Sequence, residues 1–330
     1  MMPTLSRNLP GCYFSSDAYA SLPAYHAATP ELREKAKHIL AQMRNSGLSA
    51  DSPPVISDDR LLDAMVPPLH KRIYGFAQRI ISRPDLLERE FFSARVQGLH
   101  PSAYSTVHIL RRLRSAKEFD IGKIDDLPNK FIYYPLQKTP EASINTPAPY
   151  FVDQFRAIDA IRMSMPNGYT LVVKEHWVGI DVRPTSEMKI LRRLPGVLVA
   201  NYRLSSIDII KKAALTMTVT GTAGFEGFLL GRPTLMLGKG IVAWCLGQIG
   251  RVGTLTEQIA STINNPVPDD IVIERIAEML SVTYPFYYRS TGEQGEHVLR
   301  SENIEYMADA FVDHLQREAA HDGLVSGEMG

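Results

Sequence analysis

The segment Thr218-Val-Thr-Gly-Thr-Ala-Gly-Phe-Glu226, which overlaps a predicted strand that begins at Leu215, decides the fold. The pattern predicts a buried strand over 215–220, a turn of small residues, and a helix over 225–230. A strand that passes through a glycine-containing turn directly into a helix is typical of parallel α/β sheets.

Strands and helices alternate on both sides of this segment. Further strands are expected at 131–136, 169–173, 197–200 and 234–237, and further helices at 153–163, 187–194 and 206–214. Two more helices are expected at 270–280 and 302–316. Alternation at such short intervals predicts a parallel, doubly wound sheet over residues 128–285.

The residues ahead of this region have a different pattern. They predict helices at 31–43, 58–65, 69–81, 84–95 and 103–116. No strand is expected before residue 125, and residues 1–25 are expected to form an irregular lead-in. The polar stretch 117–130 is interpreted as a boundary. We therefore expect three parts: a mainly helical region over 1–127, an α/β domain over 128–285, and a C-terminal helix and tail over 286–330.

Composition excludes several classes of protein. The 330 residues are 45% hydrophobic, which is enough for a sizeable core. Lysine plus arginine and aspartate plus glutamate number 36 each, so net charge gives no support for nucleic-acid binding. The two cysteines, Cys12 and Cys245, are too few for a disulfide framework or a zinc site and fit a reducing cytoplasm. No signal peptide and no run of 18 apolar residues is seen, so a cytoplasmic protein is expected.

Basic residues cluster locally despite the neutral total, at Arg111, Arg112, Arg114 and Lys117. The plainer interpretation is a solvated helix face. The alternative is peripheral contact with an anionic membrane surface, which would place the protein at the inner face of the cell membrane.

The turn within 218–226 carries candidate ligand-binding groups. Gly221 and Gly224 allow a ligand to approach the backbone, Thr220 and Thr222 add hydroxyls, and the start of the helix suits a phosphate. Glu226 lies one turn into the helix, where its carboxylate could accept hydrogen bonds from a ribose diol. The alternative is a turn chosen for tight packing, with Glu226 placed to complement the helix dipole. No Gly-Lys-Ser/Thr follows, so the turn is not a P-loop.

Three titratable residues close the strand at 169–173, in the segment Val172-Val-Lys-Glu-His-Trp-Val-Gly179. Lys174, Glu175 and His176 are expected at the same sheet edge as Thr220. His176 could donate a hydrogen bond to a phosphate or protonate a departing one, because its ordinary pKa is near neutrality. The alternative is a structural histidine.

The segment Tyr134-Pro-Leu-Gln-Lys-Thr-Pro-Glu-Ala-Ser143 follows the first strand of the sheet. Gln137 and Ser143 could contact a base or a sugar, and Glu141 could act as a base or accept a hydrogen bond. The alternative is a proline-rich surface loop.

Together these three segments resemble the capsule polysaccharide biosynthesis family, which includes bacterial transferases of 3-deoxy-manno-octulosonic acid (Kdo). The resemblance covers about residues 130–238 and rests on Tyr-Pro-Leu-Gln with Pro-Glu soon after, Gly-Tyr-Thr-Leu-Val-Val-Lys-Glu-His, and Thr-Val-Thr-Gly-Thr-Ala-Gly-Phe-Glu, in that order. In relatives the histidine is followed by a proline and contacts the nucleotide phosphate. Here Trp177 takes the place of that proline.

The resemblance implies a GT-B-like C-terminal Rossmann lobe that binds a nucleotide-activated sugar, either CMP-Kdo or a nucleoside-diphosphate sugar. It also implies transfer to a polysaccharide or glycolipid acceptor, with His176 and Glu141 as the candidate catalytic residues. No Asp-x-Asp pair is seen, so neither a metal nor another cofactor is expected. The N-terminal lobe of a GT-B enzyme is expected to be absent, divergent or supplied by another chain, because the preceding residues predict helices. A non-catalytic nucleotide-sugar-binding or assembly subunit and a sugar-nucleotide epimerase therefore stay open as alternatives.

Overall fold

The computed structural model describes residues 2–5, 12–15, 22–46, 117–137, 142–145, 148–176, 183–239, 245, 249–286 and 298–328. The helices expected at 58–65, 69–81, 84–95 and 103–116 lie outside these ranges, as do Arg111, Arg112 and Arg114 of the basic cluster. The helix expected at 31–43 is confirmed as α1, Pro30–Ser46.

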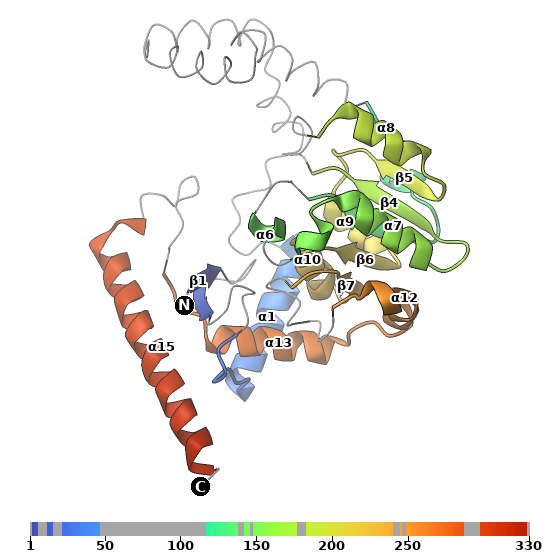
Figure 1. Ribbon diagram of the computed structural model, residues 1–330. Helices are drawn as coiled ribbons and strands as arrows, with labels where there is room; N and C mark the ends of the chain where they lie inside the picture. Colours follow the sequence, from blue (N-terminus) through green and yellow to red (C-terminus); the bar gives the residue numbers. More distant parts are fainter. Residues whose placement is uncertain are drawn as a thin grey trace, which may run out of the picture.

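A five-stranded parallel sheet forms the centre of the described chain (Figure 1). The strands are β3 (Phe131–Pro135), β4 (Thr170–Lys174), β5 (Val197–Ala200), β6 (Leu215–Thr218) and β7 (Thr234–Met236). Their order in the sheet is β5-β4-β3-β6-β7, and every neighbouring pair is parallel. The predicted α/β class is confirmed, and the strand ends differ from the predicted ones by at most two residues.

The order of the strands creates a switch point between β3 and β6. From β3 the chain winds outward through β4 to β5, then crosses back to pair β6 with the other side of β3 and continues to β7. The helices that follow β3 and β6 therefore leave the sheet in opposite directions. Ligands of open α/β sheets bind beyond the carboxyl ends of the strands at such a point.

Helices cover both faces of the sheet. One core cluster joins one face to α7 (Gln154–Ser164), α8 (Thr185–Arg193) and α12 (Leu255–Asn264). The other face carries α9 (Ser206–Lys212) and α10 (Ala223–Leu229). Short helical segments occur at α6 (Ala142–Asn145), η1 (Ile124–Asp126), η2 (Pro149–Phe151) and η4 (Val252–Thr254).

Close packing of α10 on β6 and β7 depends on glycine. A Cβ on Gly227 would lie 2.3 Å from Thr234 Oγ1, and a Cβ on Gly224 would lie 3.2 Å from both Met236 Sδ and Thr218 Cγ2. Larger residues would push the helix away from the strands, so these two glycines set the distance of α10 from the sheet.

Helix α1 packs against α13 (Asp269–Ser281) on the outer side of α10 (Figure 1). Arg33 pairs with Glu274 at 2.5 Å, and Arg44 pairs with Asp269 at 2.7 Å. Arg44 also donates to the carbonyl of Leu229 at 2.8 Å, at the end of α10. The N-terminal helix is thus part of the same packed body as the sheet.

The expected irregular lead-in is wrong, because it contains two strands. β1 (Met2–Leu5) and β2 (Cys12–Ser15) form an antiparallel pair. All four β2 side chains are buried, so this short strand lacks the polar–apolar alternation that would have revealed it. The backbone of Cys12 also exchanges two hydrogen bonds with Tyr284, at 2.9 and 2.7 Å, a partner that local sequence cannot indicate.

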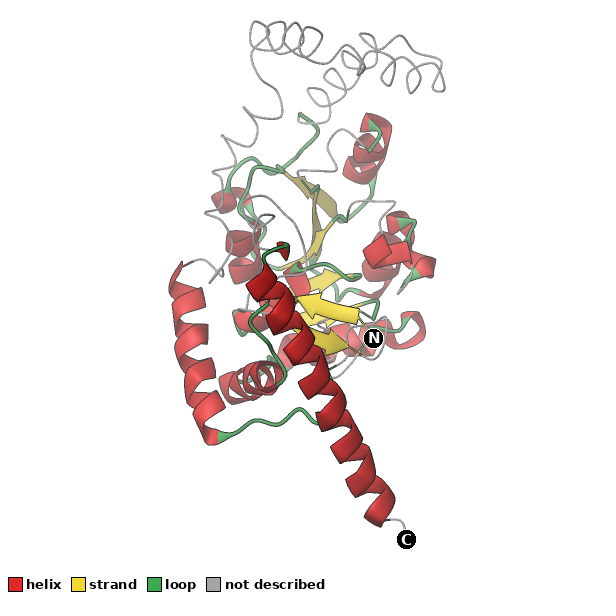
Figure 2. Cartoon of the chain, turned by 90° about the vertical axis from the view of Figure 1, so that its left-hand side faces the viewer, coloured by secondary structure: helices red, strands yellow, loops and turns green. Residues whose placement is uncertain are grey.

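Helix α15 (Ser301–Glu328) runs beside this small sheet and extends well past the predicted end at residue 316 (Figure 2). Phe14 of β2 contacts the rings of Phe311 and His314, with centroid distances of 5.6 and 5.1 Å. Within the described part of the chain, no helix combines the length and apolar character needed to cross a membrane.

Candidate functional site

The turn between β6 and α10 meets the segment after β3 at the switch point. The side-chain amide of Gln137 lies 3.3 Å from the Thr220 hydroxyl. With its oxygen toward the turn, the same amide accepts hydrogen bonds from the backbone N–H groups of Thr220 at 3.2 Å and Gly221 at 2.5 Å. In this orientation the amide oxygen of Gln137 faces hydrogen-bond donors rather than other acceptors. Three of the predicted site residues are thereby brought together.

The close contact between the Gln137 amide and the turn requires glycine at position 221. A Cβ at this position would lie 2.7 Å from Thr218 Oγ1 and 2.8 Å from the terminal amide of Gln137. Both distances are shorter than side chains tolerate, so any other residue would displace Gln137 or distort the turn.

Gln137 itself is held by Gln154, the first residue of α7. The Gln154 carboxamide oxygen accepts from the Gln137 N–H at 2.7 Å, and its NH₂ donates to the Gln137 carbonyl at 2.5 Å. Gln154 is buried, so both of its polar atoms need partners, and the backbone of Gln137 supplies them.

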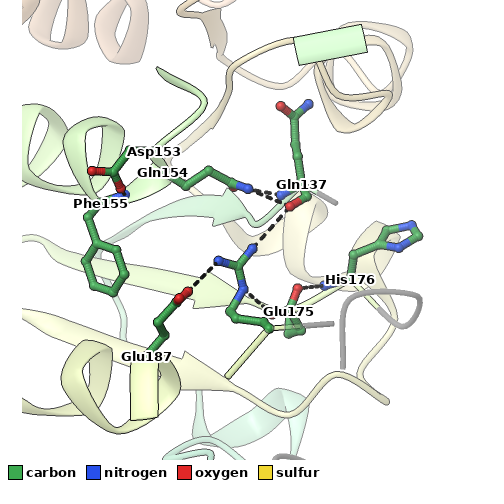
Figure 3. A network of polar contacts seen from close by, with 8 residues as sticks. Gln137, Asp153, Gln154, Phe155, Glu175, His176 and Glu187 are labelled. Carbon is green, nitrogen blue, oxygen red and sulfur yellow. Dashed lines mark hydrogen bonds and ion pairs between the residues drawn. The ribbon is translucent and has the colours of Figure 1, made fainter. Parts of the chain in front are cut away.

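An ion-pair network connects the segments that follow β3 and β4 with the start of α8 (Figure 3). Arg183 donates to Glu175 at 2.5 Å, to Glu187 at 3.1 Å and to the carbonyl of Gln137 at 3.2 Å. Burial raises the pKa of the Glu175 carboxyl, and the Arg183 guanidinium opposes this rise. The Glu175 side chain is thus occupied by Arg183.

His176 follows directly and is exposed. Its backbone N–H donates to Glu175 at 2.8 Å. In Figure 3 its imidazole points away from the side chain of Glu175. The anchored backbone and exposed ring are compatible with the predicted role of His176, which stays a prediction.

Lys174 lies on the opposite face of the sheet from Glu175, beside α9. Its ammonium group donates to Ser206 Oγ at 2.8 Å, and the Tyr133 hydroxyl donates to the same oxygen at 3.2 Å. Burial raises the pKa of Tyr133, and the nearby charge of Glu226 raises it further, so this hydroxyl stays protonated. Lys174 therefore lies beside Ser206, and half-buried Glu226 lies close enough to Tyr133 for its charge to affect that hydroxyl.

The other predicted residues are placed less informatively. Thr222 precedes α10 as its N-cap without a side-chain capping bond, and Gly224 is buried against β6 and β7. Ser143 lies in α6, but its side chain is outside the described part. Glu141 and Trp177 lie outside the described residues, so the base role of Glu141 stays a prediction.

Sequence reasoning missed Arg183, Gln154 and Ser206. One available signal was the period of two along β4: Leu171 and Val173 face one core cluster, whereas Val172 faces the other. Lys174 and Glu175 therefore had to lie on opposite faces. Glu175 lies on the same face as buried Leu171 and Val173, and a buried carboxylate needs a cationic partner. Arg183 is that partner.

The described residues contain no group of three or more histidine, cysteine, aspartate or glutamate side chains that could hold a metal ion. In the described site, the groups available to a ligand are amide, hydroxyl, ammonium, imidazole and carboxylate. Such groups suit a polar ligand that carries both hydroxyls and negative charge.

No protein-family model and no curated protein matches the chain. Among solved structures it is similar to Thermosulfurimonas dismutans KpsC, beta Kdo 2,4 transferase, at 16% identity and a TM-score of 0.30, over 50% of this chain and 61% of that one. It is also similar to Thermosulfurimonas dismutans KpsC, beta Kdo 2,7 transferase, at 20% identity and a TM-score of 0.29, over 53% of this chain and 62% of that one. A third similar structure is Methanocaldococcus jannaschii UDP-GlcNAc 2-epimerase in complex with UDP-GlcNAc and UDP. The identity is 10% and the TM-score 0.31, over 59% of this chain and 52% of that one. The chain thus spans about three fifths of the length of the two transferase structures.

Proposed function

We propose that this protein is a glycosyltransferase of bacterial capsule or surface polysaccharide biosynthesis that uses a nucleotide-activated sugar. The observation that carries the proposal is the contact of Gln137 with Thr220 and Gly221 across the switch point of the sheet. This is where open α/β sheets bind nucleotides. The described parts of the three ordered sequence segments that resemble the capsule polysaccharide biosynthesis family follow β3, β4 and β6 of the same sheet.

In this proposal the nucleotide phosphate lies against the turn formed by Thr220, Gly221 and Thr222. Lys174, whose ammonium donates to Ser206 of α9, is the candidate source of positive charge, and Glu226 accepts hydrogen bonds from hydroxyls of the ribose or sugar. Gln137 lies between the two sides of the site and contacts the base or sugar, and Ser143 extends this contact.

The reaction would displace the nucleotide from the anomeric carbon of the donor by a hydroxyl of a polysaccharide or glycolipid acceptor. The bond between the anomeric carbon and the phosphate oxygen breaks, and a bond to the acceptor oxygen forms. Negative charge grows on the leaving phosphate, where His176 and the turn stabilise it. A base, for which Glu141 is the candidate, takes the proton of the acceptor.

The test is direct binding of CMP, UDP, GDP and their sugar conjugates, measured by thermal shift and then by calorimetry. A ligand at 100 times its dissociation constant stabilises a protein by about 2.7 kcal/mol, which gives a clear shift. Thr220→Val should weaken binding by about tenfold, because one hydroxyl contact is lost. Thr256→Val, at the start of α12, is the matched control.

Three outcomes separate the alternatives. Transfer of the sugar to an acceptor supports a transferase. Binding without any turnover would identify a nucleotide-sugar-binding subunit, and conversion of the donor without an acceptor would identify an epimerase or a hydrolase. Failure to bind any of these nucleotides would refute the proposal.

A further inference from the structure

Arg183 connects two strand ends that are separate in the sequence. Its guanidinium donates to the Gln137 carbonyl at 3.2 Å, after β3, and to the Glu175 carboxylate at 2.5 Å, after β4. It also donates to Glu187 in the first turn of α8, at 3.1 Å. One side chain thus contacts three elements around the switch point (Figure 3).

The connection continues from Glu175 to His176. One carboxylate oxygen of Glu175 accepts from Arg183, and the other accepts from the backbone N–H of His176 at 2.8 Å. The position of His176 relative to Gln137 is therefore fixed through three consecutive charge-assisted hydrogen bonds. Such bonds are short and directional, so they define the geometry more tightly than apolar packing would.

Stability alone explains this pair poorly. The side chains of Arg183 and Glu175 are only 10% and 6% exposed. The desolvation cost of a buried ion pair largely offsets its Coulomb attraction, and apolar replacements of both partners are often neutral for stability. A role in defining a conformation is the better explanation for charges placed here.

We propose that Arg183 is a positioning residue that holds Gln137 and His176 in register for ligand binding at the carboxyl edge of the sheet. This inference rests on the proposed function for the identity of the ligand, a nucleotide or nucleotide sugar. Arg183 acts through the Gln137 carbonyl and through Glu175.

The geometry requires arginine specifically. A guanidinium presents several N–H donors in a rigid plane, so it can reach Glu175, Glu187 and the Gln137 carbonyl together. A lysine would keep an ion pair with Glu175, but a single ammonium at the end of a flexible chain cannot hold the same three acceptors in place. Arg183→Lys therefore separates charge from geometry.

The test uses four variants of the full chain: Arg183→Met, Arg183→Lys, the double variant Glu175→Met/Arg183→Met, and the control Arg192→Met. Arg192 also pairs with two carboxylates, Glu118 and Asp120, but these contacts are at the other end of α8. Affinity for CMP and UDP is measured by calorimetry, and stability by urea unfolding.

We expect Arg183→Met to lose stability, because it leaves the Glu175 charge buried and unpaired. It should also lose at least about tenfold in affinity, because Gln137 and His176 are no longer held in register. The double variant should be more stable than Arg183→Met, while its affinity stays low. Arg183→Lys should likewise be more stable than Arg183→Met and bind weakly. The control should bind like the wild type. Recovery of affinity together with stability in the double variant would overturn the inference, as would wild-type affinity in Arg183→Met.

Hydrogen exchange keeps the inference testable if the wild type binds none of the nucleotides, an outcome that refutes the proposed function separately. The amide of His176 then reports the geometry directly, because it donates to Glu175. Faster exchange at His176 and Gln137 in Arg183→Lys, but not in Arg192→Met, supports the positioning role. Unchanged exchange overturns it.

Discussion

The hydroxyl of Tyr25 lies 2.6 Å from Nδ1 of His314, a residue 289 positions away in the chain. His314 is fully buried and stacks on Phe14, with ring centroids 5.1 Å apart. Its Nε2 has no hydrogen-bond partner among the described residues. The contact thus joins α15 to the N-terminal part of the chain through a buried histidine.

Acidification should weaken this attachment. Burial lowers the pKa of His314, and Arg317 adds to the effect, whereas Asp313 and Glu318 oppose it. A group with a depressed pKa contributes stability that is present above its unfolded pKa, about 6.5, and is lost as the pH falls through the folded value. Urea unfolding should therefore show lower stability at pH 5 than at pH 7.5.

The control for this prediction is His314→Gln, which can keep a hydrogen bond to Tyr25 but does not titrate. We expect a smaller loss of stability between pH 7.5 and pH 5 in this variant than in the wild type. Equal losses in the two proteins would show that other groups cause the pH dependence.

The packing of α10 gives a prediction about stability. Gly227→Ala places a methyl group 2.3 Å from Thr234 Oγ1, which donates to the Arg232 carbonyl at 3.0 Å and cannot move without losing that bond. We expect a loss of roughly 1–3 kcal/mol in the free energy of unfolding, measured in urea. Gly253→Ala is the matched control, because nothing lies within 4 Å of its Cβ position. A loss as large in the control would contradict the packing argument.

The sheet could be predicted because its strands carry their own local signals. Phe131–Pro135 is an apolar and aromatic run, Leu215–Thr218 alternates apolar residues with threonine, and each is followed by a helix. The strand Cys12–Ser15 carries no comparable signal. Its burial depends on Tyr284, Phe286 and α15, which are contributed by the other end of the chain.

The site could be predicted only in part, for a related reason. Gln137 and Thr220 follow strands, so topology alone brings them to one edge. The contact between Arg183 and Glu175 depends on how the chain returns before α8, which no local pattern specifies. The sharing of Ser206 by Lys174 and Tyr133 likewise depends on the return of α9 to the sheet.

The turn after β6 gives a prediction that separates packing from ligand binding. In Gly221→Ala the new methyl group would lie 2.7 Å from Thr218 Oγ1 and 2.8 Å from the amide of Gln137. The amide ends a flexible side chain, so it would be displaced from the turn. We expect the affinity for the bound nucleotide to fall about tenfold, the equivalent of about 1.4 kcal/mol, in calorimetry.

The comparison variant is Gly224→Ala, whose methyl group would contact Thr218 and Met236 inside the helix–strand packing. It should lower stability and leave affinity close to that of the wild type. An equal loss of affinity in both variants would instead place Gly224 in contact with the ligand.

His176 gives the prediction that bears most directly on mechanism. The residue directly follows β4, its backbone is anchored by Glu175 at 2.8 Å, and its ring is exposed. If the imidazole stabilises or protonates the leaving phosphate, it acts mainly in the transition state. His176→Ala should then lower turnover by about 100-fold while donor affinity changes much less.

His38→Ala, which removes an exposed histidine from α1, should change neither quantity. Equal losses in affinity and turnover would make His176 a ground-state ligand of the phosphate, because an interaction present before the reaction cannot selectively accelerate it. If neither quantity changes, His176 takes no part in the reaction and is the structural histidine that the sequence left as the alternative.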